Sequence, residues 1–312
     1  MAYPVSLDAL NLRVRQAADC EAGSPSLRHP DAEINSFINV GIPRWYDEVR
    51  ATTWGGDYWR TNVIFTTKTG KQLYDLAADI GAGDFLSLIG VDIFLSPGGQ
   101  FFRANPFPEE MRDAFQAWPG LPINTWPGWY QIQGPAIFFN PPPTGAYDVR
   151  INYVPTAPVL GGLNHSSFVM IAGGSGYTSQ PSITISGGGG SGATAIPIVK
   201  NGKVVDVSVT NPGSGYTTTA TVTVSGGGGV GAAISASPTL SIDSINGWEE
   251  AIVLAAARMV ARKDKDWETV AALGADLEVE LARIRAMAAQ RDKNVSEHIH
   301  DTQIDWADWR WR

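Results

Sequence analysis

The sequence predicts a mixed α+β protein, in which an antiparallel helical bundle core is accompanied by β-hairpins and strands and carries a small inserted all-β domain. Three observations lead to this fold class. Apolar residues recur at helical spacing near both ends of the chain, and they alternate with a period of two between Thr61 and Val154. A glycine-rich segment also occurs twice between Pro158 and Ser241. Each pattern belongs to a different kind of element.

Two helices are predicted ahead of the alternating region. Ser6 is a suitable N-cap for the first. Its apolar face would comprise Leu7, Leu10, Val14 and Ala17. The second begins near Pro30 and Asp31. Its stripe would comprise Ile34, Phe37, Ile38, Trp45 and Val49. Pro43 lies inside this second pattern and should kink or split the helix, because an interior proline costs about 3 kcal/mol.

The alternating region predicts strands. The run from Phe85 to Ile93 has the apolar character of a buried strand, and the residues from Tyr147 to Tyr153 alternate regularly. Tyr130 to Ile132 and Ala136 to Phe138 flank Gly134, which indicates a hairpin.

The glycine-rich segment is an internal repeat. The first copy, GSGYTSQPSITISGGGGSGATAI, begins at Gly174, and the second, GSGYTTTATVTVSGGGGVGAAIS, begins 39 residues later at Gly213. Each copy contains a β-branched strand and a tetraglycine turn, and Asn201-Gly202 between them is a type I′ hairpin signal. Two copies are too few for a solenoid. We therefore expect a small pseudo-symmetric β domain inserted at residues 163–237.

The tyrosine of each copy, Tyr177 and Tyr216, has two interpretations. Both rings could offer aromatic faces to a carbohydrate, or both could pack in the β core with their hydroxyl groups at an edge. The segment could accordingly be a decoration without a ligand, a contact to fibers or neighbouring subunits, or a carbohydrate-binding module. It resembles the GGSGYTS-type repeats of phage and bacterial surface proteins, which does not identify a ligand.

Residues 244–292 predict a helical hairpin. Asn246 is a suitable N-cap, Glu249 stands where a capping-box carboxylate would lie, and Asp266 would cap the second helix. The stripe of the first helix would comprise Trp248, Ile252, Ala255 and Met259. That of the second would comprise Val270, Leu273, Leu277, Leu281, Ile284 and Ala288. Because only a short polar connection joins the two amphipathic helices, they should pack antiparallel.

Signatures of catalysis or metal binding are scarce. The glycine runs lack the Gly-Lys-Ser/Thr of a P-loop, and the four histidines show no HExxH spacing. His298 and His300, two residues apart near the C-terminus, form a pair that is usually solvated. Asp75, Asp79 and Asp84 are interpreted as turn and helix-cap residues. We therefore expect no catalytic residue, no metal site and no cofactor.

The composition fits a soluble chain that folds in the cytoplasm. Its net charge of -8 argues against tight binding of nucleic acid, which normally needs clustered Lys and Arg. A single cysteine, Cys20, excludes an intramolecular disulfide. No apolar run approaches the roughly 20 residues that span a bilayer, and the N-terminus lacks a signal-peptide pattern. We expect no membrane association.

The last residues, 292–312, depart from the helical pattern and end in an amphiphilic tip. Its tryptophans and arginines are Trp306, Trp309, Arg310, Trp311 and Arg312. Disordered polar tails are poor in tryptophan, whereas Trp and Arg are the usual anchors of interfaces. The tip could fold back on its own helices, but docking into a partner is the preferred interpretation.

Three stretches carry a resemblance to a known family. They are INSFINVGIPRWYDEVRATTWGGDYW, GKQLYDLAADIGAGDFLSLIGVDIFL and SINGWEEAIVLAAARMVARKDKDWETVAALGADLEVELARIRAMAAQRD. Together they resemble the head-to-tail adaptor (connector or head-completion) proteins of tailed phages, over residues 4–160 and 240–301. The resemblance implies an adaptor core at residues 1–160 and 240–291, to which the repeat at 163–237 is an addition, and a portal-docking tail at 292–312.

The resemblance also implies a structural virion protein without enzymatic activity. Such adaptors form a ring, of 12 copies, in the neck between portal and tail. The implied partners are the portal protein, tail, nozzle or fiber proteins, and double-stranded DNA, which passes through the bore without sequence-specific binding. In these proteins the C-terminal segment wedges between portal subunits, so the five tip residues would contact the portal.

A tail appendage or receptor-binding protein is the alternative function. In that case the repeat domain would bind carbohydrate or a host surface. An adhesin normally forms trimers and places its repeats at a terminus, whereas here the repeats lie inside the chain. Their position therefore favours the adaptor.

Overall fold

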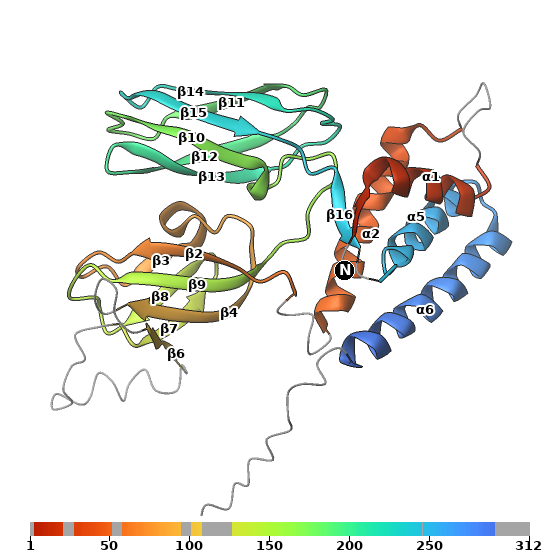
Figure 1. Cartoon of the computed structure of the whole chain (residues 1–312), viewed down its shortest axis with the longest axis horizontal. Coiled ribbons are helices and arrows are strands. Elements are labelled where there is room, and N and C mark those ends of the chain that lie inside the picture. Colours follow the sequence, from red (N-terminus) through yellow and green to blue (C-terminus); the bar gives the residue numbers. More distant parts are fainter. Residues whose placement is uncertain are drawn as a thin grey trace, which may run out of the picture.

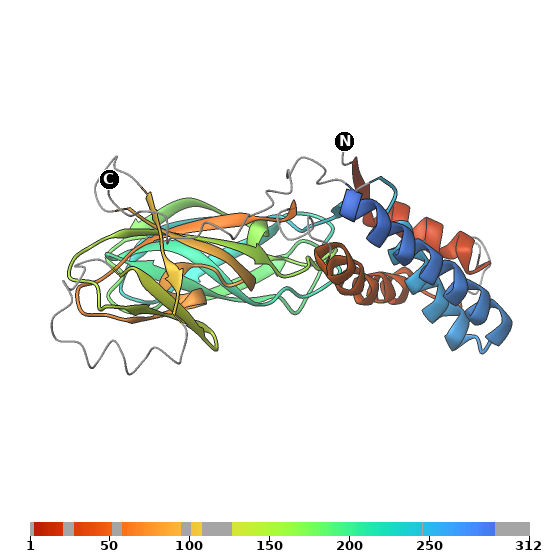
Figure 2. The same cartoon turned by 90° about the horizontal axis from the view of Figure 1, so that it is seen from below.

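The computed structural model shows an elongated molecule, with helices at one end and strands at the other (Figures 1 and 2). The strands form two β units that lie one above the other in Figure 1. The structure describes residues 3–20, 28–51, 58–94, 101–107, 127–244 and 246–290.

The helical end has a single hydrophobic core. Its helices are α1 (Leu7–Ala17), α2 (Asp31–Ala51), α5 (Glu250–Lys263) and α6 (Trp267–Gln290). α5 contacts each of the other three, and its buried surface is rich in alanine, which lets neighbouring helices approach closely. Beside this core, β1 (Tyr3–Ser6) pairs antiparallel with β16 (Ser241–Ser244). This ribbon joins the start of the chain to the segment that leads into α5.

Two of the predicted helix N-caps, Ser6 and Asp266, are confirmed. The Ser6 hydroxyl accepts a hydrogen bond of 3.2 Å from the amide of Ala9 in the first turn of α1. Asp266 caps α6 in the same way, through the amide of Thr269 at 3.2 Å. Pro43 lies within α2, which runs through it without being split.

The predicted cap of α5 is wrong. Asn246 lies in a turn with a φ of 54°, and the helix begins at Glu250 without a side-chain cap. The Glu249 carboxylate, predicted to belong to a capping box, accepts a hydrogen bond of 2.9 Å from Arg13 of α1. Arg13 also forms an ion pair with Glu250. The acidic start of α5 therefore serves a contact between helices.

The first β unit is a sandwich of two four-stranded sheets around one core. Its elements are β2 (Thr61–Thr66), β3 (Leu73–Asp75), the short helix η1 (Leu76–Ile80), β4 (Phe85–Phe94), β5 (Phe101–Arg103), β6 (Asn105–Pro106), β7 (Trp129–Gln133), β8 (Ala136–Asn140) and β9 (Asp148–Pro155). The sheet orders are β2-β9-β4-β5 and β3-β8-β7-β6. The expected buried strand, hairpin and alternating strand are confirmed as β4, β7-β8 and β9.

The second β unit contains both copies of the repeat. Its strands are β10 (Phe168–Ser175), β11 (Ser182–Gly187), β12 (Thr194–Lys200), β13 (Lys203–Asn211), β14 (Ala220–Ser225) and β15 (Val230–Ala236). Four form a sheet in the order β10-β15-β14-β11, and β12 pairs with β13. The predicted hairpin at Asn201-Gly202 is confirmed, since both residues have positive φ.

This second unit has an internal two-fold relation. A shift of 39 residues carries the β10-β15 pair onto the β13-β12 pair, and β11 pairs with its own equivalent, β14. β11 also lies beside β12, and β10 beside β13, so the strands close around a small core on each side of the axis.

The fold is mixed α+β, as expected, but more of the described residues lie in strands than in helices. The expectation of a helical bundle as the core of the protein is not confirmed. The helices surround one hydrophobic core at one end of the molecule. The sandwich and the repeat unit each bury apolar residues in separate cores. Among the helices that the structure describes, none is long and apolar enough to cross a membrane.

Candidate functional site

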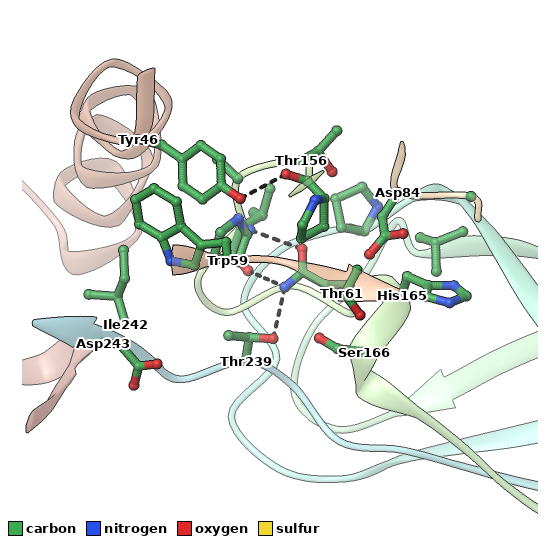
Figure 3. A pocket seen from close by; sticks show the side chains of 18 of the residues that line it. Tyr46, Trp59, Thr61, Asp84, Thr156, His165, Ser166, Thr239, Ile242 and Asp243 are labelled. Carbon is green, nitrogen blue, oxygen red and sulfur yellow. Dashed lines mark hydrogen bonds between the residues drawn. The ribbon is translucent and has the colours of Figure 1, made fainter. Parts of the chain in front are cut away.

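The helical end, the sandwich and the repeat unit meet around a cavity of about 400 Å³ (Figure 3). α2 contributes Tyr46, and the end of β9 and the loop after it contribute Pro155 and Thr156. His165 and Ser166 of the short helix η3 (His165–Ser167) also line the cavity, as do Thr239 and residues 241–243. Here the chain passes from the sandwich into the repeat unit and returns toward the helices, so the side chains around this cavity set how the three parts are joined.

Tyr46 fastens α2 to the end of the sandwich. Its hydroxyl donates to the carbonyl oxygen of Pro155 at 2.8 Å, and its ring stacks on Trp59 with centroids 3.9 Å apart (Figure 3). Burial raises the pKa of the Tyr46 phenol far above its usual value, which keeps the hydroxyl a proton donor. The contact is therefore independent of pH over the physiological range.

Two asparagine side chains fasten the crossover into the repeat unit. Asn39 of α2 pairs with the backbone of Leu160, accepting from its amide at 2.8 Å and donating to its carbonyl at 2.9 Å. Asn164 makes the same two contacts with Val159, at 2.9 Å each, and also donates to the Thr239 hydroxyl at 2.9 Å. Because Thr239 follows the repeat unit, Asn164 ties its entrance to its exit.

The repeat unit rests on the sandwich through two glycines. A Cβ atom at Gly81 would lie 2.5 Å from a carboxylate oxygen of Asp206, and one at Gly83 would lie 2.8 Å from the Ser208 hydroxyl. Gly81 also has a φ of 91°, which L side chains rarely adopt. These glycines follow η1, so the turn between η1 and β4 is shaped to receive β13.

The same interface gathers ionisable groups. Burial raises the pKa of the Asp206 carboxyl, and nearby Asp84 acts in the same direction, while His165 opposes it. Asp84 accepts a hydrogen bond of 2.7 Å from the Tyr153 hydroxyl, whose pKa is raised by burial and by that carboxylate. The Asp206 carboxylate therefore lies in an environment that disfavours its charge.

The groups around His165 do not form a nucleophile and base pair. Its Nδ1 lies 3.0 Å from the Val207 carbonyl oxygen and so donates, and its Nε2 lies 3.9 Å from the Asp206 carboxylate. The neighbouring Ser167 hydroxyl instead accepts from the amide of Asn164 at 3.0 Å. Within the stretches that the structure describes, no three His, Cys, Asp or Glu residues gather as metal ligands.

The acids interpreted as turn and cap residues do serve local structure. Asp75 caps η1 by accepting from the amides of Ala77 and Ala78, at 3.0 and 2.7 Å. Asp79 accepts from the amide of Asp75 at 2.9 Å and pairs with Lys71. Asp84 differs, because it accepts a hydrogen bond from Tyr153 of β9 and also lines the cavity together with His165 of η3.

Tyr177 and Tyr216 are both buried, with 5% and 2% of their surfaces exposed. Each ring lies on the tetraglycine turn of the other copy. A Cβ atom at Gly229 would lie 2.5 Å from the Tyr177 ring, and one at Gly190 would lie 2.5 Å from the Tyr216 ring. This placement matches the packing interpretation, and an aromatic face could meet a sugar only if the turns opened.

The expected portal contacts Trp306, Trp309, Arg310, Trp311 and Arg312 lie outside the described residues, as do His298 and His300. Sequence reasoning missed Asn39, Asn164 and the contact of Gly81 and Gly83 with β13. A signal was present for the glycines, because alternating glycines between a turn and a strand indicate close approach of another segment. No comparable signal marks the asparagines, since their partners are backbone groups far away in the sequence.

Part of the chain matches a family of known proteins. Residues 6–166, just over half of the chain, match the family model described as the SU10 adaptor protein. The match begins at the cap of α1 and ends inside η3, so it spans α1, α2 and the whole sandwich and stops where the repeat unit begins. No curated protein matches the chain.

Proposed function

Because the chain belongs to the SU10 adaptor protein family, we propose that this phage structural protein is a head-to-tail adaptor that joins the capsid vertex to the tail. Copies of the chain, 12 by resemblance to such adaptors, form a ring below the portal and enclose a channel for the genome. The observation that carries the proposal is the family match over residues 6–166. The protein is a component of the virion and acts in its neck.

The adaptor core comprises residues 1–160 and 240–291, and residues 163–237 are an insertion in it. Two observations support this division. The family match ends at residue 166, and the bridge between Gly162 and Thr239 brings the ends of the repeat unit together. A unit whose ends meet interrupts the chain at one point. The insertion therefore leaves the connection between the sandwich and the helices of the core unchanged.

The C-terminal tail, residues 292–312, binds the portal. Trp306, Trp309 and Trp311, with Arg310 and Arg312, have the composition of interface anchors, in which a few aromatic and arginine side chains carry most of the binding energy. α6 ends at Gln290, so the tail continues from the end of the longest helix described.

The channel does not grip DNA. The chain has 31 acidic and 23 basic side chains, and its net charge of -8 lacks the excess of Lys and Arg with which proteins neutralise phosphates. Double-stranded DNA then passes without sequence-specific contacts. Tail, nozzle or fiber proteins bind below the ring.

The proposal predicts that the free protein is soluble and builds a ring mainly on a portal template. Light scattering of the isolated protein, and electron microscopy of the protein mixed with portal, measure the two states. A stable trimer that ignores portal would contradict the adaptor and favour the alternative, a tail appendage or receptor-binding protein whose repeat unit binds carbohydrate or a host surface.

A further inference from the structure

The strand β2 lies at a free edge of the sandwich. In its sheet, of order β2-β9-β4-β5, it pairs only with β9. Just after β2, the amide of Thr67 donates to the carbonyl oxygen of Tyr147. Because residues of an antiparallel pair alternate between bonded and non-bonded positions, this bond fixes the pattern along β2. Asn62, Ile64 and Thr66 accordingly turn their amide and carbonyl groups away from β9, toward the free edge.

This edge lacks the features that normally protect an edge strand from further pairing. Natural proteins shorten such strands or place charges, prolines or bulges in them. Among the described residues, the other edge strands of the sandwich are short, since β3 and β5 have three residues each and β6 has two, one of them Pro106. β2 has six residues, without charge or proline, and its register with β9 contains no bulge. Its sequence, Thr-Asn-Val-Ile-Phe-Thr, favours pairing with a further strand.

A groove of about 650 Å³ follows the edge of β2. β2 is the strand of its sheet nearest to the repeat unit in Figure 1, and the β12-β13 hairpin of that unit forms the opposite wall. We call this the β2 groove and define it by Ile64, Lys68, Lys200 and Val205. Ile64 and Val205 are 55% and 42% exposed. Unpaired backbone groups beside apolar side chains are the features that bind an extended peptide as an added strand.

The free charges of the β2 groove are cationic. Lys68 and Lys200 line it, and neither forms an ion pair with a described residue. Burial lowers the pKa of the Lys200 ammonium, and the carboxylates of Asp206 and Asp79 oppose this only in part. Asp79 is itself paired with Lys71. The groove therefore favours a peptide that carries carboxylates of its own.

The free edges described for the sandwich would not supply such a segment from a second copy. β5 carries Arg103, which the two lysines would repel, and β2 and β6 carry no charge. β3 carries Asp75, whose carboxylate already caps η1. Another protein is therefore the better source of the added strand.

We propose that the β2 groove binds an extended, acidic segment of another virion protein, which adds to the sheet as a strand beside β2. The segment pairs its backbone with Asn62, Ile64 and Thr66 and places a carboxylate beside Lys200. Only the choice of a virion protein as the donor rests on the proposed function, in which other proteins bind the adaptor. The repeat unit then has a role in binding, because its hairpin supplies one wall of the groove and Lys200.

The test selects peptides that bind the full-length protein from a random library displayed on ribosomes. Lys200→Glu reverses the charge in the groove. Lys203→Glu is the matched control, because Lys203 is an exposed lysine of the same hairpin that does not line the groove. Hydrogen exchange of the β2 amides measures whether a bound peptide pairs with the free edge.

The selected peptides should be rich in Asp and Glu and poor in proline, which cannot donate to a ladder. Their binding should protect the amides of Asn62, Ile64 and Thr66 from exchange. Lys200→Glu should weaken binding by about tenfold or more, as expected when a charge-assisted contact is lost. Lys203→Glu should bind as the unsubstituted protein does.

Failure to select any peptide, equal binding by the two variants, or unchanged exchange in β2 would overturn the proposal. The selection is repeated with a chain that ends at Asp292. Peptides that bind only this shorter chain would assign the groove to the tail of the protein itself, and so overturn a partner protein as its occupant. Self-association that Lys200→Glu abolishes would assign it to a second copy. None of these results depends on ring formation, so the adaptor function stands or falls separately, by electron microscopy with portal.

Discussion

At the scale of single residues, the repeat unit depends on glycines that leave room for a ring or a carboxylate. Gly190 and Gly229 do not have positive φ, so their lack of a side chain is explained by the tyrosine rings that lie on them and not by backbone strain. Gly81, in the sandwich, requires glycine for two reasons. Its φ is positive, and Asp206 occupies the space of a Cβ atom. The glycine content of the repeat is thus a packing requirement at identifiable positions.

Gly229→Ala tests this explanation. The added methyl group would lie 2.5 Å from the Tyr177 ring, and forcing extra atoms into a packed site typically costs about 1–3 kcal/mol in the free energy of unfolding. Urea denaturation of the full chain measures the loss. Gly145→Ala is the control, because a Cβ atom there meets only Tyr147 at an ordinary 3.7 Å and should cause no loss of stability. Equal stability of the two variants would contradict the account of the tetraglycine turns.

Asp206→Asn tests the interface between the repeat unit and the sandwich. Burial raises the pKa of the Asp206 carboxyl, so the folded protein holds this proton more tightly than the unfolded chain. The wild-type protein therefore loses stability from this group as the pH rises from about 3.9, the unperturbed value, through the higher folded pKa. The asparagine variant lacks this loss.

The stability of Asp206→Asn relative to the wild type should accordingly increase between about pH 4 and pH 7, the window above the unperturbed pKa. Thermal unfolding over a pH series measures the difference. Asp276→Asn, which removes an exposed carboxylate on α6, is the control and should show a smaller change. A difference that falls with rising pH would mean that the carboxylate is stabilised by its surroundings.

At the scale of elements, the local patterns predicted most strands and helices because each pattern reflects which side of an element is buried. The alternation from Tyr147 to Tyr153 became β9, and the stripe from Leu273 to Ile284 became the buried side of α6. The cap predicted for α5 at Asn246 was wrong, since that residue lies in a turn and the helix begins later, at Glu250. The bond between Glu249 and Arg13, 236 positions earlier in the chain, could not be predicted, because such a partner leaves no local signal. The junction around Asn164 was missed for the same reason.

The repeat unit should be separable from the adaptor core. The amide of Gly161 donates to the carbonyl of Thr239 at 2.8 Å, so a short linker can join the ends after the unit is removed. Replacing residues 163–237 with a few Gly and Ser residues should leave the helices and the sandwich folded. Closing such a loop changes the free energy of unfolding by about 1 kcal/mol or less. Cooperative thermal unfolding of the shortened chain is the measurement. Loss of cooperativity would show that the unit is part of the core.

At the scale of the whole molecule, the chain joins a helical end to a sandwich and a repeat unit, and the family match covers α1, α2 and the sandwich. The family could be anticipated from the two N-terminal stretches, which lie within the matched residues 6–166. The resemblance over residues 240–301 and the tail lies beyond that match. Assembly depends on surfaces shared between chains, and a single sequence carries no direct pattern for them.

Truncation after Asp292 should leave a folded, soluble subunit that binds portal much more weakly. A docked tail must offset the ordering of its backbone, about 1–2 kcal/mol per residue, through buried anchors. Tryptophans at the centre of an interface can each contribute about 2 kcal/mol or more. Co-sedimentation with portal compares the truncated and intact chains. Equal binding would assign the portal contact to the helices.

Electron microscopy of the protein assembled with its portal tests the adaptor function most directly. The account predicts class averages in which a closed ring of this chain lies below the portal, coaxial with it, around an open channel wide enough for duplex DNA. The number of copies in the ring follows from the same averages, with 12 expected. Trimers, or particles in which the chain is absent from the portal axis, would contradict the account.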